Sequence, residues 1–563
     1  MKATTVGKPI APATGPGSVG SGPARRWIRL GVVAVLAALL VGVDLGGAPL
    51  LDPDEARHAE AAREILERGG GVEPLLNYEP YRHKPSLFYM LVGATFRMFG
   101  ETETAARLVP ALSVWLTLIV VYLAASRDGV YRALSAVLYL AASGFFVLVG
   151  RFTNFDGLLT ASLTMGAAAF ARWLDRRDLQ SPAPAVPARD DAWLLDIAYA
   201  SVGVATLVKG PVALVLLAAP VLVMVALQRV GLRELRPVRG AIIVVAIVAC
   251  WLVPAAVTAP EYVREFLWVH NVQRFLGGSS VFHPEPFWFF VPIIAAALLP
   301  WSLMLPRAMA AATRRSSADL FLVLYALWVV LFFSMSSGKL ATYVLPAFPA
   351  AALLVARWIP RSADARPWEG RAACLIAAAA MAATTPVALG VLGVFARAEI
   401  AVAFVFVPVS AAGFYVLTGA RRGTGPASSG DAMAWLCGGA VASILLLTAT
   451  CGAALGRWSS DRDLALAALE RGIAEPVIAY RVQPYSFLFY TKRPMRILYG
   501  AQSVDGIDGH DRELILSKPR RLDELRERLA GREIEVIASN ARHLLIVSSP
   551  VDGADDMPDD PVR

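Results

Sequence analysis

Long apolar runs recur along this chain of 563 residues and constrain its fold more than any other feature. A run of about 18 or more apolar residues is long enough to cross the hydrocarbon core of a bilayer as a helix. Within a bilayer each backbone amide must be paired inside its own segment, so these runs are expected to be helical. The sequence therefore predicts an α-helical polytopic membrane protein and excludes a string of ordinary soluble domains.

Thirteen runs are expected to be membrane spans. They cover residues 28–47, 105–126, 131–150, 155–173, 192–209, 211–228, 238–258, 287–306, 318–336, 340–359, 372–395, 399–419 and 433–455. The first run follows Arg25 and Arg26, which also fits a secretory or twin-arginine signal peptide. No convincing small-residue cleavage site follows the run, so an uncleaved first span is the favoured interpretation.

Charge and cysteine usage exclude several other classes of protein. Charged residues make up 17% of the chain, whereas soluble domains carry about 25%. The net charge of +8 does not indicate a nucleic-acid partner, because most of the arginine lies between apolar runs, where membrane topology explains it. Cys250, Cys374, Cys437 and Cys451 all lie in apolar runs, without the spacing of a disulfide framework or a cysteine metal site.

Lys and Arg gather in alternate connections between the runs. The connections on the side of the N-terminus hold 24 of them and the short connections on the other side hold six. Positive residues accumulate on the cytoplasmic side of a membrane. The N-terminus is therefore expected in the cytoplasm and, with an odd number of spans, the C-terminus outside, as in a protein of the bacterial inner membrane.

Three parts of the chain follow from this layout. Residues 1–23 are rich in Gly, Pro and Ser and read as a disordered cytoplasmic tail. Residues 24–455 form the membrane domain, with long outer loops at 48–104 and 259–286. Residues 456–563 are highly charged and predict a small periplasmic α/β domain, with strands at Val477–Tyr480, Glu535–Ala538 and Leu544–Ser548 and helices at Asp461–Arg471 and Leu522–Leu529.

The first outer loop begins with acidic residues beside the first span. Helical spacing of Ala59, Ala62 and Ile65 predicts a short amphipathic helix from Asp54 to Arg68 along the membrane surface. Asp54 and Glu55 would then stand at its N-terminus, where acidic residues also act simply as helix caps. Either role, chemistry or capping, fits the two carboxylates taken alone.

Further ionisable residues recur at the outer ends of the spans and in the second loop. Lys84 stands where the chain re-enters the membrane, although a lone lysine there can also snorkel. His270 and Arg274 are four residues apart and share one helix face, and the remaining members of the group are Lys339, Tyr343, Asp156 and Lys209. Charges near hydrocarbon usually face a cavity or a pathway. The expected ligand is a phosphate carried by a lipid, with an uncharged group beside it for the acids to handle.

The order of the motifs resembles a known family. The motifs are Asp-Glu-x-Arg-x-Ala-Glu at Asp54–Glu60, Lys-Pro-x-Leu-Phe-Tyr at Lys84–Tyr89, Phe-Gly-x-x-Glu-x-x-Ala-Arg-Leu at Phe99–Leu108, His-x-x-x-Arg-Phe at His270–Phe275, Lys209-Gly210-Pro211 and Tyr343–Pro346. In this order and topology they look like the lipid-linked glycosyltransferases of the GT-C superfamily. The aminoarabinose transferases of lipid A resemble the chain most, and the protein O-mannosyltransferases more distantly.

The resemblance implies a GT-C fold and a sugar transfer on the outer face with inversion at the anomeric carbon. The donor would be a polyprenyl-phosphate sugar, and the acceptor lipid A or another envelope glycan or glycolipid. Asp54, beside Glu55, matches the family's essential acid, which would act as general base for a hydroxyl acceptor or would position groups around a phosphate acceptor. The residues that match donor-phosphate positions are Lys84, Arg274 and Tyr343, with Lys209, Lys339 and Asp156 as further polar members of the site.

One position departs from the family pattern. In the aminoarabinose transferases a Glu precedes the Lys-Pro and holds zinc together with a histidine of the second loop. This chain has His83 there, with His270 as the second candidate ligand. Two imidazoles can bind zinc when water or phosphate completes the shell. Alternatively, His83 forms a hydrogen bond to the donor and no metal is bound.

Three other functions are alternatives to this one. A protein O-mannosyltransferase would keep the site and change the acceptor. A flippase or transporter would place ionisable residues near the middle of the bilayer, whereas the centres of most runs here are Ala, Val and Leu. A scaffold role would leave the loop residues unexplained. Tyr480, Tyr485, Tyr490 and Arg481 of the tail either line an acceptor route or belong to the core and surface of that domain.

Overall fold

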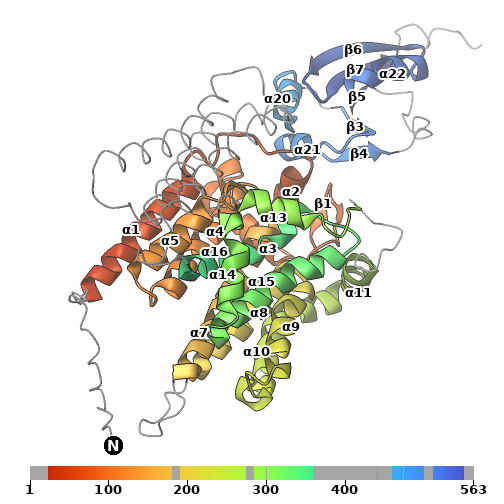
Figure 1. The fold of residues 1–563 in the computed structure, drawn as a ribbon. Coiled ribbons are helices and arrows are strands. Elements are labelled where there is room, and N and C mark those ends of the chain that lie inside the picture. Colours follow the sequence, from red (N-terminus) through yellow and green to blue (C-terminus); the bar gives the residue numbers. More distant parts are fainter. Residues whose placement is uncertain are drawn as a thin grey trace, which may run out of the picture.

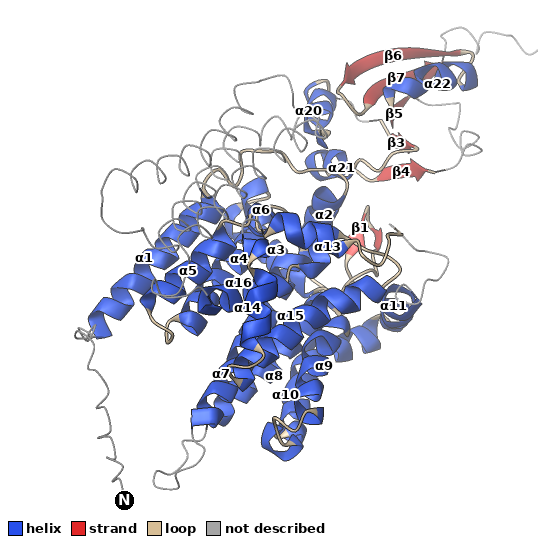
Figure 2. Cartoon of the chain, viewed as in Figure 1, coloured by secondary structure: helices blue, strands red, loops and turns tan. Residues whose placement is uncertain are grey.

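A computed structural model describes residues 23–179, 191–273, 284–298, 301–358, 441, 459–472, 475–499 and 512–550. Figures 1 and 2 show a helical body with a small sheet-containing domain at one end. The predicted spans 372–395, 399–419 and 433–455 lie outside the described residues, apart from residue 441.

Four helical segments of the body are long and apolar enough to cross a membrane. They are α4 (Glu103–Ala125), α8 (Ala192–Lys209), α10 (Pro237–Thr258) together with the 3₁₀ turn η1 (Leu232–Leu235) before it, and α15 (Ser317–Met335). The chain is therefore a multi-pass membrane protein, as the apolar runs predict. Capping fits the sequence at two of these helices: Thr102 accepts a hydrogen bond from the Ala105 N–H at 3.2 Å, and Ser316 accepts one from the Asp319 N–H at 3.1 Å.

The remaining described helices complete the body. They are α1 (Pro23–Gly42), α3 (Leu87–Phe99), α5 (Val130–Ala141), α6 (Gly144–Val149), α7 (Phe155–Leu179), α9 (Val212–Ala226), α11 (Pro260–Leu267), the π-helical turn η2 (Trp268–Gln273), α13 (Phe290–Ala297), the 3₁₀ turn η3 (Trp301–Leu303), α14 (Leu305–Ala312), the 3₁₀ turn η4 (Ala341–Val344) and α16 (Ala347–Trp358).

Three predicted spans are not the continuous helices that the sequence indicates. Residues 131–150 form α5 and α6, residues 287–306 fall in α13, η3 and α14, and residues 340–359 begin with η4 before α16. The first break has a clear cause at Ser143. Its hydroxyl accepts from the Phe146 N–H at 3.4 Å and donates to the Ala297 carbonyl at 2.8 Å, so it caps a new helix and ties it to α13.

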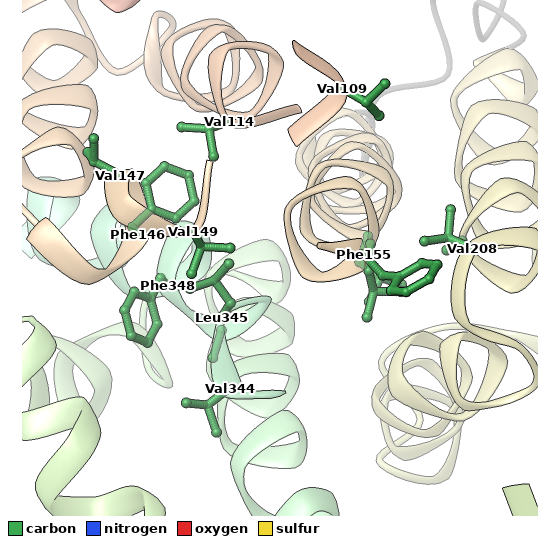
Figure 3. Close-up of a cluster of buried hydrophobic side chains, with 14 of the residues drawn as sticks. Val109, Val114, Phe146, Val147, Val149, Phe155, Val208, Val344, Leu345 and Phe348 are labelled. Atoms are coloured by element: carbon green, nitrogen blue, oxygen red, sulfur yellow. The ribbon is translucent and has the colours of Figure 1, made fainter. Parts of the chain in front are cut away.

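The centre of the body is packed with large apolar side chains. Figure 3 shows Phe146, Phe348, Leu345 and Val114 in one cluster, with contributions from α4, α6 and α16. All four residues are fully buried. Because lipid tails are as apolar as these side chains, close van der Waals packing rather than exclusion of water holds such helices together.

The first outer loop folds back on the body. It contains α2 (Asp54–Glu67), in close agreement with the predicted amphipathic helix, and a hairpin of β1 (Leu75–Leu76) and β2 (Glu79–Pro80). Asn77 and Tyr78 form the hairpin turn with positive φ angles of 58° and 61°. The buried Glu64 carboxylate of α2 stabilises this turn by accepting both backbone N–H groups, at 2.7 and 2.8 Å.

The tail forms a domain with a five-stranded sheet. In chain order its elements are α20 (Arg462–Glu470), β3 (Val477–Tyr480), α21 (Tyr485–Thr491), β4 (Met495–Leu498), β5 (Glu513–Ser517), the 3₁₀ turn η6 (Pro519–Arg521), α22 (Leu522–Arg528), β6 (Arg532–Ser539) and β7 (Leu544–Pro550). The strand order is β4-β3-β5-β7-β6, parallel around β3 and antiparallel around β7. The α/β prediction and its five elements are confirmed, and α21, β4 and β5 are additions.

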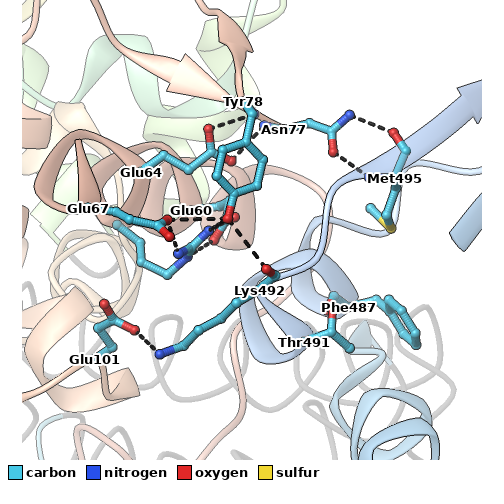
Figure 4. A network of polar contacts seen from close by, with 11 residues as sticks. Glu60, Glu64, Glu67, Asn77, Tyr78, Glu101, Phe487, Thr491, Lys492 and Met495 are labelled. Carbon is cyan, nitrogen blue, oxygen red and sulfur yellow. Dashed lines mark hydrogen bonds and ion pairs between the residues drawn. The ribbon is translucent and has the colours of Figure 1, made fainter. Parts of the chain in front are cut away.

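Two sets of polar contacts hold the tail domain on the first outer loop. In the first, drawn in Figure 4, the Asn77 side chain exchanges two hydrogen bonds of 2.7 Å with the backbone of Met495. Nearby, the Lys492 ammonium pairs with Glu101 at 2.5 Å. The hairpin turn of the loop is therefore hydrogen-bonded to β4, an edge strand of the tail sheet.

The second set is buried and centres on Asp52, directly before α2. Its carboxylate accepts hydrogen bonds from the Ser486 N–H at 2.8 Å and from the Ser486 hydroxyl, and its own N–H donates to the Ser459 carbonyl at 2.9 Å. The Asp461 backbone N–H donates to the Ser486 hydroxyl at 2.9 Å, and the Asp461 carboxylate lies 2.6 Å from Nδ1 of His543. Burial, followed by the nearby charge of Asp461, raises the pKa of Asp52 from 3.8 to about 8.

Candidate functional site

A cavity of about 520 Å³ lies where both outer loops meet the helical body. Its lining combines polar and apolar residues. The polar ones are Lys84, Lys209, His270, Asn271, Ser336 and Tyr343, and the apolar ones include Pro211, Val212, Val215, Leu267, Val272, Phe332 and Phe333. The cavity can therefore hold a ligand with a charged head and a hydrocarbon body.

Lys209 and Asp156 form a buried ion pair beside this cavity. The Lys209 ammonium also lies 4.2 Å from the centre of the Tyr343 ring. Asp156 is the second residue of α7, and its N–H donates to the Asn154 side chain at 2.9 Å. Because the Asp156 carboxylate neutralises the charge of the Lys209 ammonium, the pair adds polar groups to the cavity lining but no net positive charge.

The break between α8 and α9 places Lys209. Gly210 has a φ of +89°, and a Cβ at this position would lie 2.6 Å from the Phe266 ring. Pro211 follows and starts the next helix, so Lys209 is the last residue of α8 and its side chain reaches the cavity. Only glycine suits this combination of positive φ and close approach.

Lys84 enters the cavity from the first loop and is held by the second. The Tyr262 hydroxyl of α11 donates to the Lys84 carbonyl at 2.5 Å. Tyr262 is fully buried against Trp251, at a ring separation of 5.6 Å. The charge of Lys84 also acts on Asp156, so the structure brings together three of the predicted site residues, Lys84, Asp156 and Lys209.

His83 and His270 lie side by side at the same rim. Their ring centres are 4.2 Å apart, and Tyr81 packs on the other side of His83 at 4.5 Å. Glu265 lies 3.5 Å from Nε2 of His270. Within the described ranges no group of three or more His, Cys, Asp or Glu side chains could hold a metal ion. The described residues alone supply too few ligands for a protein zinc site.

The two acidic residues at the start of α2 have different surroundings. Asp54 is 65% exposed and pairs with Arg57, so its carboxylate is open to a substrate. Glu55 is buried, and its carboxylate accepts from Arg107 at 2.7 and 2.9 Å and from the Thr153 N–H at 3.1 Å. Its contacts are those of a structural residue that joins α2 to α4.

One other predicted cation, Lys339, lies elsewhere. Lys339 is buried and donates to the Glu285 carbonyl at 2.6 Å, next to the bridge between Pro284 and Gly338, and it does not line the cavity. Its contacts favour a role in holding the second loop. Arg274 lies outside the described residues.

The sequence did not identify several residues near the site as candidate site residues. Arg57 was visible only as the Arg of the first motif, and Tyr81 as an aromatic residue two positions before His83. Asn271 lines the cavity, and its amide group donates to the Phe266 carbonyl at 2.7 Å. No spacing rule connects these residues, because Arg57 and Tyr81 lie in separate parts of the first outer loop and Asn271 lies in the second.

Comparison with known proteins gives matches in both sequence and fold. Residues 50–264 match the family model of dolichyl-phosphate-mannose-protein mannosyltransferase. The chain is 34% identical over 345 residues to an undecaprenyl phosphate-alpha-4-amino-4-deoxy-L-arabinose arabinosyl transferase of Pectobacterium carotovorum, an alignment that covers 59% of each chain. A Pseudomonas fluorescens protein of the same description is 31% identical over 61% of this chain and 59% of its own length.

The chain thus spans about three fifths of the length of the curated relatives that it matches. Its fold is similar over a longer stretch to the crystal structure of ArnT from Cupriavidus metallidurans bound to undecaprenyl phosphate. That match has a TM-score of 0.77 at 22% identity and covers 93% of this chain and 98% of the other. The resemblance to lipid-linked glycosyltransferases is therefore confirmed, in sequence over three fifths of the chain and in fold over nearly all of it.

Proposed function

We propose that the protein transfers a sugar from a polyprenyl-phosphate donor to lipid A or another envelope glycan or glycolipid. The cavity carries this proposal, because lysine and tyrosine side chains share its lining with many apolar residues. Such a shape suits a lipid phosphate, whose anion needs cations and whose prenyl chain needs hydrocarbon. The curated relatives carry undecaprenyl phosphate-linked aminoarabinose in their names, which makes that sugar lipid the first donor to test.

In this proposal Lys84 and Tyr343 hold the donor phosphate, with Lys209 held in place by Asp156. An acceptor oxygen forms a bond to the anomeric carbon as the bond from that carbon to the phosphate oxygen breaks. Negative charge grows on the departing polyprenyl phosphate, and fixed cations in a partly dry cavity stabilise it there. Attack from the opposite face inverts the anomeric configuration. Arg274 is proposed to join the same clamp.

Asp54 is proposed to act at the acceptor. A carboxylate can take the proton of an attacking hydroxyl if it lies within hydrogen-bond reach. If the acceptor is a phosphate, no proton has to be removed, and Asp54 instead orients Arg57 and the acceptor beside it. Its 65% exposure suits both roles, because an acceptor can approach from solvent.

The proposed topology follows from the charge asymmetry of the connections. Thirteen spans with a cytoplasmic N-terminus place the cavity and the tail domain on the periplasmic side of the inner membrane. Reporter fusions after residues 128, 236 and 550 test this arrangement. The first two positions are expected in the cytoplasm and the third in the periplasm.

The central experiment uses the full-length protein in proteoliposomes with undecaprenyl phosphate-linked aminoarabinose and lipid A. Transfer adds the mass of the sugar to lipid A and releases undecaprenyl phosphate. Lys84→Ala is expected to weaken binding of undecaprenyl phosphate roughly tenfold to hundredfold, since a hydrogen bond to a charged group contributes about 1.5–3 kcal/mol. Exposed Lys492→Ala, which removes a lysine from the tail domain, is the control. Equal binding by both variants and wild type would count against the phosphate clamp.

Lipid A is not the only acceptor worth testing. The match of residues 50–264 to protein mannosyltransferases favours a serine- or threonine-containing peptide as the second candidate. If a peptide gains the mass of the sugar and lipid A does not, the protein is instead a protein glycosyltransferase.

For metal binding, we propose that His83 and His270 take up zinc only when donor phosphate oxygens complete its shell. Zinc content measured with and without undecaprenyl phosphate tests this. Zinc retained by the lipid-free protein, or absent in both samples, would contradict it.

A further inference from the structure

A row of aromatic rings leads from the cavity toward the tail domain. His270 lines the cavity, His83 packs on His270 at 4.2 Å, and Tyr81 packs on His83 at 4.5 Å. Beyond Tyr81 lies Arg57 of α2, and the Arg57 guanidinium interacts electrostatically with the Tyr81 hydroxyl. The row therefore extends the site beyond the cavity that holds the donor.

Arg57 is the cation at the far end of this row. Its guanidinium carbon lies 5.9 Å from the centre of the Tyr485 ring. Nε of Arg57 is buried and has no hydrogen-bond partner in the part of the chain that the structure describes. Burial disfavours the charge on Arg57, but Tyr81, Asp54 and Tyr485 outweigh it and raise the pKa. A guanidinium that stays charged, half-buried and with one nitrogen unsatisfied is suited to bind an anion.

The tail domain supplies Tyr485 to the same place. Tyr485 begins α21, and the next residue, Ser486, is fixed by its two hydrogen bonds to Asp52. Tyr499 lies close enough to Tyr485 to raise the pKa of Tyr485, and Tyr499 itself is 62% exposed. Tyr485 thus occupies a fixed position at the junction between the tail domain and α2.

The other tail tyrosines point elsewhere. The Tyr480 hydroxyl donates to Glu524 at 2.8 Å, and the Tyr490 hydroxyl donates to Glu103 at 2.9 Å. Both therefore have structural partners. Of the tail tyrosines considered as acceptor residues from the sequence, Tyr485 is the one placed against a cation of the first loop.

We propose that Arg57 and Tyr485 form an acceptor subsite for a phosphorylated saccharide, with one residue supplied by each domain. This inference rests on the proposed function. The acceptor phosphate binds Arg57, and the Tyr485 ring, which is buried with 6% of its surface exposed, holds the Arg57 guanidinium in position through a cation–π contact. Asp54, paired with Arg57, then lies at the acceptor, while Lys84 and Lys209 hold the donor.

The test measures transfer to lipid A and to the same lipid A after enzymatic removal of its phosphates. Arg57→Gln is expected to raise the KM for phosphorylated lipid A roughly tenfold to hundredfold, the loss of hydrogen bonds to a charged group. Tyr485→Ala is expected to raise the same KM roughly twofold to tenfold. Both variants should bind undecaprenyl phosphate as wild type does, and Arg57→Lys should fall between wild type and Arg57→Gln.

Arg462→Gln is the matched control. Arg462 lies 5.6 Å from the Tyr490 ring, so it forms the same kind of arginine–tyrosine contact within the tail domain, but it pairs with Glu103 away from the row. An unchanged acceptor KM in Arg57→Gln overturns the subsite. An equal loss with phosphorylated and dephosphorylated lipid A overturns it as well, because Arg57 would then not recognise the phosphate.

The failure of the proposed function is a separate result. Wild type that releases no undecaprenyl phosphate from the donor with any acceptor refutes the transferase assignment. Binding of phosphorylated lipid A, measured by native mass spectrometry, still tests the subsite in that case. Weaker binding by Arg57→Gln than by Arg462→Gln supports it, and equal binding overturns it.

Discussion

The buried carboxyl of Asp52 makes the attachment of the tail domain sensitive to pH. In the docked state its pKa is raised from 3.8 to about 8, first by burial and then by the charge of Asp461. The Ser486 hydrogen bonds and the nearby Arg542 oppose this shift without cancelling it. When the tail domain separates from α2, Asp52 meets water and its pKa returns toward the ordinary value.

The sign of the effect follows from the proton count. Between about pH 4 and pH 8 the docked state holds one proton more than the separated state, so the docked state loses stability as pH rises. The loss is about 1.4 kcal/mol for each pH unit in this range and stops once the docked carboxyl is ionised. From pH 6 to pH 9 the docked state is expected to lose about 3 kcal/mol, or roughly 100-fold in the opening equilibrium.

Asp52→Asn should remove this dependence. The asparagine side chain is neutral across this pH range, and its amide oxygen can accept the Ser486 N–H as the Asp52 carboxyl does in the wild type. Hydrogen exchange of the Ser486 amide reports opening directly, because that N–H donates to Asp52. After correction for intrinsic exchange, protection in wild type should fall roughly 100-fold from pH 6 to pH 9, while protection in the variant should stay level.

Asp523→Asn is the control for this experiment. Asp523 lies in the tail domain with a side chain that is 91% exposed, so its replacement should leave the pH profile of Ser486 as in wild type. Wild-type protection that is constant or increases with pH would refute the reasoning. So would an Asp52→Asn variant that shows the same decline as wild type.

Three further predictions concern the membrane side of the site. Asp156→Asn leaves the buried Lys209 without its partner and should destabilise the protein by about 3–5 kcal/mol; thermal unfolding measures this, and a double variant with Lys209→Met that is no more stable than Asp156→Asn contradicts it. Gly210→Ala forces a Cβ against Phe266 at positive φ and should weaken undecaprenyl phosphate binding by moving Lys209; binding as tight as wild type in a folded variant speaks against that placement. Asp54→Asn should abolish sugar transfer while donor binding persists, so turnover at the wild-type rate removes Asp54 from the mechanism.

Local sequence patterns predicted the elements that depend on neighbours in the chain. Apolar length located most spans, helical spacing located α2, and a short β-like run matched the bounds of β3 at Val477–Tyr480. The grouping of Lys84, Lys209 and Asp156 also came from the sequence, through the shared membrane face of their loops. The structure supplied the contacts that turn this grouping into a cavity wall.

Features that depend on distant partners were not predictable in this way. The break at Ser143 needs the carbonyl of Ala297, and the structural role of Glu55 needs Arg107, 52 residues further along the chain. Asp52 looked like one more acidic residue of the first loop until Ser486 was found against it, 434 positions away. A single sequence carries no signal for pairings of this kind.

The hydrogen bond from Tyr262 to the carbonyl of Lys84 joins two loops that lie 178 positions apart in the chain. Because the acceptor is a backbone atom, a shift of α11 is transmitted to the peptide from which the ammonium of Lys84 extends. If the cavity binds a prenyl phosphate as proposed, a prenyl chain that displaces the second loop would therefore also displace Lys84. Binding of the lipid tail and binding of its phosphate would then be mechanically coupled.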